Sequence, residues 1–409
     1  MVHLLSDNDA MTAFLVTQHF RPDETSTSVF LTAIAEELAK DDDVVVISGT
    51  RGSARAGNPA VLEMPSWSPP KTALIRRALA MLWFCMGALI ALTWRARRDT
   101  PVFVVTTPFM LPYFVSLAAW LRGAPTTLIL YDLYPESLIA ANLIAKQSWT
   151  ARLILHLNEW MFHILEAVVV IGRDMEKHLS RYKGATSDKI CFIPHWSTLA
   201  PALRPVDPDN QFRPAGTDKL VVGLSGNLGF THDPDTVFAA ARALADQPGV
   251  HFLLSGWGVG WHRLVDAQRA AGLPNVTLME RVAETDLENF LTAADVWIIP
   301  YRRGMSGISS PSRLYNLLAI GRPVIALSES DAEYGLMLSE HRAGWVVEPE
   351  NAAELAQTIC AAAHDPGDVA TRSRNAVQLL QDRFTRDSAG NAYCRLANQL
   401  RTTGKTRTP

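Results

Sequence analysis

The chain has 409 residues, of which 48% are hydrophobic and 19% are charged, and its formal net charge is -3 at pH 7. This length exceeds one ordinary hydrophobic core, so we expect two globular domains, and the slightly acidic balance gives no support to nucleic-acid binding. The four cysteines are scattered without metal-ligand spacing, which predicts reduced thiols.

The N-terminus lacks the pattern of a signal peptide. Asp7 and Asp9 interrupt the stretch where an apolar core would be needed, and no basic start precedes it. Met11 directly precedes the first expected strand, so residues 1–10 are expected either to be disordered or to lie upstream of the true start.

Short apolar runs alternate with helical segments along the first half of the chain. The expected strands are residues 12–18, 44–47, 102–105, 127–130 and 167–171. The expected helices are residues 29–38, 76–98, 111–121 and 151–165. This alternation predicts an α/β domain in which crossover helices connect the strands of a parallel sheet. Asp41, Asp42 and Asp43 precede a strand, and we expect them to form a solvated turn.

Residues 78–94 contain no charged side chain. Arginines bracket this segment on both sides: Arg76, Arg77, Arg95, Arg97 and Arg98. The segment is at the lower length limit for a membrane span, and basic residues at both ends give no clear orientation. Three interpretations therefore stay open, namely a mostly buried domain helix, a helix lying on a membrane surface and a true span.

The second half repeats the alternating pattern. The expected strands are residues 220–224, 250–254, 276–278, 296–299, 324–326 and 345–347. The expected helices are residues 235–244, 264–271, 285–293, 353–363 and 371–384, with one more beginning at Arg313. Four prolines mark a linker over residues 198–216. We therefore expect domains at 12–198 and 217–384, a helix at 385–400 that could return to the first domain, and a frayed basic tail at 401–409.

Two loops in the second half combine polar residues with glycine or proline between a strand and a helix. Residues 225–229 follow one strand, and residues 309–312 open the helix that begins at Arg313. The first N–H groups of a helix have no partners within it and attract anions. Because the helix dipole disfavours a cation at that end, Arg313 suggests a compensating anion such as a phosphate. Two such loops point to a diphosphate ligand.

Seven collinear segments carry a resemblance to a known family. They are Phe20 to Thr27, Tyr131 to Glu136, Val170 to Met175, Lys189 to Trp196, Gly226 to Gly229, Ser310 to Arg313 and Gly321 to Ala326. Together they resemble the retaining glycosyltransferases of family 4, and among them the bacterial exopolysaccharide and colanic-acid-type subgroup. The resemblance covers the chain from about Phe14 to about Leu396. It implies the GT-B fold, in which two Rossmann-like, doubly wound domains face an interdomain cleft.

The resemblance also implies an activity. It is the metal-independent transfer of a hexosyl or N-acetylhexosaminyl group from a nucleotide sugar, UDP- or GDP-linked, with no further cofactor. Relatives often carry Arg and Lys where this chain has Asn227 and His232, and two glutamates where it has Ile308 and Asn316. These departures leave open a non-catalytic nucleotide-sugar-binding scaffold, and a nucleotide-sugar epimerase of the same fold is a second alternative.

The residues expected at the site fall into two groups. The catalytic group is Asp132, Glu136 and Arg313. The donor-binding group is Thr27, Arg173, Gly226, Asn227, Leu228, Gly229, Gly256, Arg281, Val282, Ser310, Pro311, Ser312 and Asn316. Each has a structural alternative, such as capping of a helix by Glu136 or by the threonines near Thr27, tight turns at the glycines, or packing of the Arg313 stem on Tyr315. His195 is expected to be a packed residue rather than a catalyst.

The expected partners are a nucleotide-sugar donor and a lipid-linked or saccharide acceptor. Peripheral membrane contact through residues 76–98 is a further expectation, because basic residues attract anionic lipid headgroups. The protein is accordingly expected in the cytoplasm, either free or on the inner face of the plasma membrane.

Overall fold

The computed structural model describes residues 12–67, 69, 73–214 and 218–406. The expectations for residues 1–10 and for the last three residues therefore lie outside the described residues. The chain divides into two compact units. Unit 1 consists of Met1–Pro135, Lys146–Pro194 and Asp387–Pro409, and unit 2 consists of Glu136–Ala145 and His195–Arg386.

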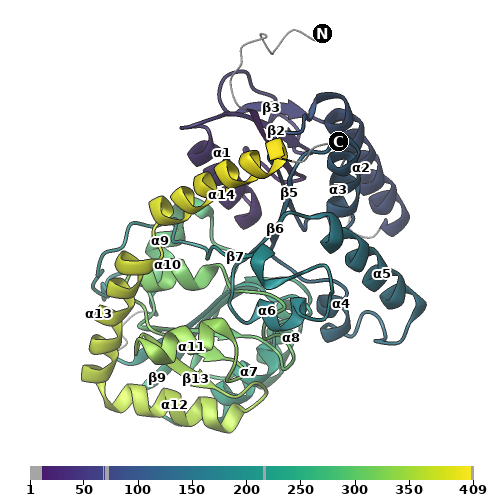
Figure 1. Cartoon of the computed structure of the whole chain (residues 1–409). Helices are drawn as coiled ribbons and strands as arrows, with labels where there is room; N and C mark the ends of the chain where they lie inside the picture. Colours follow the sequence, from purple (N-terminus) through teal and green to yellow (C-terminus); the bar gives the residue numbers. More distant parts are fainter. Residues whose placement is uncertain (1–11, 68, 70–72, 215–217, 407–409) are drawn as a thin grey trace. The chain divides into compact units, whose positions relative to one another are not determined.

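Unit 1 is built on a seven-stranded parallel sheet with the order β3-β2-β1-β4-β5-β6-β7 (Figure 1). Its strands are β1 (Thr12–Thr17), β2 (Asp43–Ser48), β3 (Ala60–Glu63), β4 (Val102–Val105), β5 (Thr126–Leu130), β6 (Ala167–Val170) and β7 (Ile190–Phe192). Every residue of β4, β5 and β6 is buried, which is typical of a parallel sheet covered on both faces. The strand order reverses between β1 and β4, as in other doubly wound sheets.

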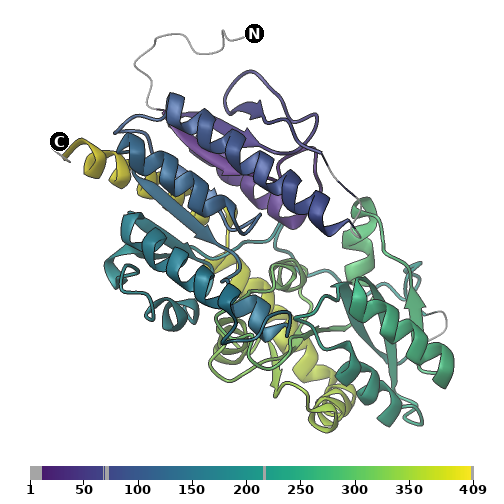
Figure 2. The ribbon, with the colours of Figure 1, turned by 90° about the vertical axis from the view of Figure 1, so that its right-hand side faces the viewer.

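Helices cover both faces of this sheet. The larger ones are α1 (Ser26–Leu38), α2 (Leu74–Arg95), α3 (Leu111–Arg122), α5 (Trp149–Ile164) and α14 (Arg386–Thr406). Right-handed crossovers put α2, α3 and α5 on one face, where they lie side by side (Figure 2). On the other face α14 packs beside α1, since the thiol of Cys394 donates to the Glu37 carbonyl oxygen at 3.5 Å.

The start of β2 and the end of α14 correct two expectations. Asp41 and Asp43 are exposed, as expected for a solvated turn, but Asp42 is buried and forms an ion pair with the buried guanidinium of Arg401. The tail is helical through Thr406, whereas fraying was expected from residue 401 onward. The expectations for Asp42 and for the tail were wrong because these partners, far apart in the sequence, pack together and remove each other's charge from water.

Helix α2 is long and apolar enough to cross a membrane by length and composition, but it is the crossover that connects β3 to β4. Only 33% of its most apolar window is buried. One side packs on the sheet through Phe84, Cys85 and Leu92, while the opposite side is exposed. The mostly buried interpretation was therefore wrong, because the hydrophobic pattern runs around the whole helix and the sheet can cover only one side.

Unit 2 is built on a six-stranded parallel sheet with the order β10-β9-β8-β11-β12-β13. Its strands are β8 (Leu220–Asn227), β9 (Val250–Trp257), β10 (Val276–Met279), β11 (Val296–Pro300), β12 (Val324–Leu327) and β13 (Gly344–Val347). The strand order reverses between β8 and β11. The predicted α/β class, with two Rossmann-like parallel sheets, is thus confirmed.

Two hydrophobic clusters lie on opposite faces of this second sheet. One is covered by α7 (Pro234–Ala243), α8 (Val259–Ala271) and α12 (Ala352–His364). The other is covered by α9 (Leu287–Thr292), α10 (Arg313–Ala319), α11 (Glu333–Glu340) and α13 (Pro366–Arg383). The short helix α4 (Glu136–Ala140) adds Ala140 to the second cluster. Because the helices cover the two faces of the sheet, the carboxyl ends of the strands are flanked by loops.

The proline-rich segment that precedes β8 packs along unit 2. The Ala202 N–H donates to the Ala319 carbonyl oxygen at 2.9 Å. The buried Arg322 guanidinium donates to the carbonyl oxygens of Arg204 at 2.8 Å and Thr292 at 3.1 Å. Burial is the main reason that the pKa of Arg322 falls to about 10. The segment is therefore held by specific bonds to the α9 and α10 region.

Candidate functional site

The strand reversal in unit 2 marks a location where doubly wound sheets bind ligands, just outside the carboxyl ends of the strands. Strands β8 and β11 are neighbours there, and Gly226 and Asn227 form the last two positions of β8. The expected loop 225–229 therefore begins as strand, because Ser225, Gly226 and Asn227 pair with the end of β9. The ladder continues three residues past the apolar pattern that had predicted its end.

Gly226 and Arg313 come together at this location. Gly226 has a φ of +130°, a conformation that L residues rarely adopt. A Cβ atom at Gly226 would lie 2.6 Å from Arg313 Cζ, so the guanidinium rests directly against the glycine backbone. The side chain of Arg313 therefore reaches from the start of α10 to the end of β8, instead of only packing on Tyr315.

A second set of close approaches joins the end of β8 to the start of α8. The Leu228 N–H donates to the Trp257 carbonyl oxygen at 2.8 Å, and the Gly260 N–H donates to the Leu228 carbonyl oxygen at 2.8 Å. A Cβ atom at Gly256 would lie 2.8 Å from the Gly226 carbonyl oxygen. Glycine is needed at Gly256 because two backbones meet there. The two strand ends thus form one rigid floor.

The loop after Gly229 is fastened to the end of β11. The backbone of His232 bridges to Tyr301, and their rings are stacked with centroids 4.8 Å apart. Arg302 donates through its Nε to the His232 carbonyl oxygen at 2.9 Å. Burial first, and then the positive charges of Arg313 and Arg302, lower the pKa of His232 to about 4. A neutral histidine therefore lies beside two arginines.

Arg281 forms an aromatic contact at the end of β9. Its guanidinium carbon lies 4.5 Å from the centroid of the Trp257 ring, within the range of a cation–π interaction. Val282, the next residue, packs against the hydrophobic cluster under α10. The Ser255 hydroxyl donates to the Glu280 carbonyl oxygen at 2.9 Å, which holds this loop to β9.

The loop before α10 is half-buried and has few hydrogen bonds of its own. Pro311 is buried, and Ser310 and Ser312 are partly exposed. Ser312 caps α10 without a side-chain hydrogen bond. Asn316 is engaged elsewhere, because its Oδ1 accepts from the Thr198 N–H at 2.8 Å and from the Ser197 hydroxyl at 3.0 Å. Only its NH₂ group is left to reach a ribose.

The expected site residues of the first half lie at separate strand ends. Thr27 is in the first turn of α1, whose N-cap is Thr25, as the capping interpretation predicted. Arg173 is exposed after β6 in unit 1. Glu136 is buried in the first turn of α4 and belongs to unit 2, whereas Asp132 belongs to unit 1.

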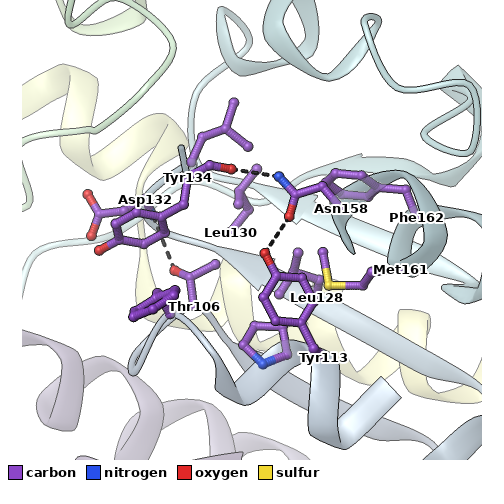
Figure 3. A pocket seen from close by; sticks show the side chains of 12 residues that line it. Thr106, Tyr113, Leu128, Leu130, Asp132, Tyr134, Asn158, Met161 and Phe162 are labelled. Atoms are coloured by element: carbon purple, nitrogen blue, oxygen red, sulfur yellow. Dashed lines mark hydrogen bonds between the residues drawn. The ribbon is translucent and has the colours of Figure 1, made fainter. Parts of the chain in front are cut away.

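Asp132 lines a small pocket in unit 1 at the carboxyl ends of β4 and β5 (Figure 3). The pocket lies between α3 and α5 and is lined by Thr106, Phe109, Pro112, Tyr113, Leu128, Leu130, Asp132, Leu133, Tyr134, Asn158, Met161 and Phe162. The Asp132 carboxylate lies beside the Tyr134 ring in Figure 3. Burial and the Asp132 charge both raise the pKa of Tyr134, so its hydroxyl stays protonated.

Asn158 fixes the wall of this pocket. It accepts from the Tyr113 hydroxyl at 2.7 Å and donates to the Tyr134 carbonyl oxygen at 2.6 Å (Figure 3). It also donates to the Tyr182 hydroxyl at 3.1 Å. The Thr106 hydroxyl oxygen accepts from the Asp132 N–H at 3.3 Å. The backbone around Asp132 is thus held from two sides, by Asn158 of α5 and by Thr106 after β4.

The two halves of the chain match two families of catalytic domains. Residues 219–365 match Glycosyl transferases group 1, and residues 27–196 match the Glycosyl transferase 4-like domain. Together these matches cover more than three quarters of the chain. Both matched families are glycosyltransferases, so the predicted glycosyltransferase activity is supported.

Two curated relatives extend over most of this glycosyltransferase. The glycosyltransferase WbjE of Pseudomonas aeruginosa is 28% identical over 71% of this chain and 72% of its own. WcaI of Escherichia coli (strain K12), a glycosyl transferase named for colanic acid biosynthesis, is 28% identical over 76% of this chain and 78% of its own.

Solved structures show the same fold at low identity. Sucrose-phosphate synthase from Thermosynechococcus elongatus has a TM-score of 0.75 at 17% identity, covering 96% of this chain and 100% of that one. Anabaena HepE, solved in complex with UDP and glucose, has a TM-score of 0.65 at 16% identity and the same coverage of each chain.

Sequence reasoning missed three residues in these two candidate regions. Arg302 lies two residues after the end of β11, so the same rule that pointed to cations at strand ends could have found it. Trp257 ends β9 next to a selected glycine, and an aromatic there signals a stacking surface. Asn158 had no sequence signal, because it lies on α5 and meets its partners only through the fold.

We predict that Gly226→Ala lowers turnover of this glycosyltransferase roughly tenfold, because the new Cβ displaces the Arg313 guanidinium and L residues are strained at this φ. The measurement is kcat in the single variants Gly226→Ala and Arg313→Ala and in the double variant. The double variant should lose much less than the product of the two single losses, because the clash with the guanidinium is gone and only the backbone strain at residue 226 remains.

Gly249→Ala is the matched control, because Gly249 is exposed, lies outside the proposed site, and a Cβ there would meet nothing within 4 Å. It should leave kcat unchanged. Additive losses in the double variant would show that Gly226 acts independently of Arg313.

Proposed function

We propose that this glycosyltransferase moves a sugar from a nucleotide diphosphate to a hydroxyl of a lipid-linked or polysaccharide acceptor, with retention of anomeric configuration. The proposed role is cell-surface polysaccharide biosynthesis, which the name of the colanic acid relative supports. The donor is proposed to be UDP- or GDP-linked. Complexes of Anabaena HepE with UDP and with UDP-glucose support a nucleotide-sugar ligand.

One observation carries this proposal. At the strand reversal of unit 2, the Arg313 guanidinium lies against Gly226, and Arg302 is bonded to the neighbouring loop. A departing nucleoside diphosphate develops negative charge, and cations already in position stabilise it without reorganising. Arg313 and Arg302 would supply that charge with protein groups alone, so the proposed reaction needs no metal ion.

The proposed donor contacts follow from the positions already described. The floor formed by Gly226, Leu228 and Gly256 would let the diphosphate approach the backbone closely, as glycines permit. Arg281 on Trp257 would lie beside the nucleobase. Retention would come from acceptor attack on the face that the leaving phosphate vacates, with that phosphate helping to remove the acceptor proton. We assign no covalent nucleophile.

The proposed acceptor side is the unit 1 pocket. Asp132 would orient the acceptor hydroxyl toward the leaving phosphate or, as the alternative to that phosphate, accept the proton itself, which requires a carboxylate within hydrogen-bond reach. A lipid-linked acceptor would place the enzyme on the cytoplasmic face of the plasma membrane. The arginines of residues 76–98 support peripheral contact there, because basic residues near anionic lipids are attracted to the surface.

Two alternatives are distinguished by products. A nucleotide-sugar epimerase would convert the donor sugar without any acceptor, whereas a transferase would at most hydrolyse it slowly. A non-catalytic scaffold would bind the nucleotide and transfer nothing to any acceptor extract. This alternative is kept because Asn227 and His232 stand where the family resemblance implies Arg and Lys. Incubation with donor alone, followed by incubation with acceptor extract, separates all three.

We predict that one class of nucleotide sugar raises the melting temperature of the protein by several degrees. A ligand at about 100 times its Kd stabilises the folded state by ~2.7 kcal/mol. The measurement is a thermal-shift screen against UDP-, GDP-, ADP- and dTDP-sugars, with free sugars as the control. If no nucleotide sugar shifts the melting temperature, the proposed donor site is wrong.

A further inference from the structure

Helices α2, α3 and α5 cover one face of unit 1 (Figure 2). This face exposes large apolar side chains on more than one helix. We call it the three-helix face. The most exposed are Trp94 at 82%, Ile75 at 79% and Trp149 at 75%. Trp120 and Leu121 at the end of α3 are also exposed. Single exposed apolar side chains are common on soluble proteins, but so many large ones gathered on one face point to a partner.

The exposed residues of α2 form one stripe along its whole length. Ile75, Leu79, Trp83, Met86, Ile90 and Trp94 recur at the helical spacing of three or four residues. At 1.5 Å per residue this stripe is about 28 Å long. The opposite side of α2 is buried on the sheet, so the stripe faces outward while the helix stays in its domain.

Helix α5 carries a second stripe, which the sequence analysis did not single out. Trp149, Leu153, Leu157 and Trp160 follow the same spacing and are exposed. Its buried side supplies Asn158, Met161 and Phe162 to the pocket that Asp132 lines. The stripe therefore lies on the outer side of the helix that forms the pocket wall.

Charge on the three helices is strongly one-sided. Within their bounds they carry five arginines and one glutamate, although the whole chain has a net charge of -3. The Arg122 Nε donates to the Ala96 carbonyl oxygen at 3.1 Å, which joins the end of α3 to the end of α2. Arg97 and Arg98 follow directly and are exposed. An apolar surface with tryptophans and basic ends matches an anionic lipid interface.

A second copy of the chain fits this face less well. Twofold dimers bring the same patch of both copies together. The arginine clusters at the ends of the stripes would then approach each other and repel. A membrane span fits less well too, because α2 would have to leave the sheet that buries Phe84, Cys85 and Leu92.

We propose that the three-helix face docks on an anionic membrane surface with α2 and α5 lying in the interface as two anchors. The tryptophans insert at headgroup depth, and the arginines contact lipid phosphates. Two separated stripes would fix the orientation of unit 1, with the wall of the Asp132 pocket held next to the lipid. This inference extends the proposed contact of residues 76–98 and does not depend on glycosyl transfer.

The test is cosedimentation with vesicles of phosphatidylcholine, alone and mixed with phosphatidylglycerol. We expect binding to the mixed vesicles that weakens with added salt. The α5 variant Trp149→Ser/Leu153→Ser and the α2 variant Trp83→Ser/Ile90→Ser should each reduce the partition coefficient at least ~10-fold. Removing three charges with Arg95→Gln/Arg97→Gln/Arg98→Gln should reduce it selectively on the mixed vesicles.

Phe192→Ser, on the exposed edge strand β7, is the matched control and should bind as the unchanged protein does. Melting temperatures show whether each variant is folded. Unchanged binding of a folded α5 variant would overturn the two-anchor proposal even if the α2 variant loses binding. Lack of vesicle binding by the unchanged protein, or a stable dimer that the serine variants dissociate, would overturn the lipid assignment. Neither result would change the expected turnover of the donor with a soluble acceptor, and that turnover is measured separately as the test of the proposed transfer reaction.

Discussion

Replacing Arg313 with alanine is expected to lower kcat about ten- to a hundredfold while the protein stays folded. Arg313 is partly exposed, and its guanidinium lies on Gly226 where the diphosphate is proposed to leave. A charge-assisted hydrogen bond to the departing phosphate is worth ~1.5–3 kcal/mol, which corresponds to that range. The measurement is steady-state kcat and KM with the nucleotide sugar found by thermal shift.

Two further variants make this result specific. Arg313→Lys keeps the charge but loses the planar fork of donors, so its kcat should lie between those of the unchanged enzyme and Arg313→Ala. Arg303→Ala is the matched control, since Arg303 is an arginine of the preceding loop whose guanidinium pairs with Glu348 at 3.4 Å. It should leave kcat within about twofold, as rim charges usually do. Equal kcat in Arg313→Ala and the unchanged enzyme would remove Arg313 from the mechanism.

Asp132→Asn is the second change with a large expected effect. We expect kcat to fall about 100-fold or more if the carboxylate receives the acceptor proton, because general-base catalysis contributes 10²–10⁴-fold. Asparagine preserves the shape of the pocket beside Tyr134, and the Thr106 bond to the backbone is unaffected. The measurement is transfer to acceptor at saturating donor, together with the melting temperature.

Asp188→Asn is the control for the loss of a carboxylate, because Asp188 lies on the short helix η1 (Ser187–Lys189) of unit 1 and none of its three residues is buried. Its kcat should be unchanged. Glu136→Gln tests the other expected acid. If Glu136 caps α4, the melting temperature falls while kcat holds. Transfer at the original rate by Asp132→Asn would restrict Asp132 to a structural role.

Local sequence pattern predicted most of the architecture of both units. Buried parallel strands are almost wholly apolar, so Val102–Val105 and Val296–Pro300 were visible as short hydrophobic runs. Short or edge elements were missed, among them β3 and α11, because their residues are only partly apolar or too few to show a period. The ends of β8 and β9 were placed too early, since glycine pairs in a ladder without an apolar side chain.

The candidate site was predictable in part. Gly226, Gly256 and Arg313 stood out because glycine before a helix and a cation in a first turn each have a local physical meaning. Their mutual contact did not, because Gly226 and Arg313 are far apart in the chain. The engagement of Asn316 by Thr198 was equally invisible, and it limits the ribose contact that had been expected.

The sequence alone predicted an α/β chain of two Rossmann-like halves, the glycine loops after the strands, and an apolar helix bracketed by arginines. Each of these features depends on residues that are close together in the chain. Other features were decided only by the tertiary structure. Whether Asp42 is solvated or paired with Arg401, which side of α2 is covered, and that α5 carries a second apolar stripe all depend on which surfaces meet. Burial is a property of the packed chain, so no single segment contains it.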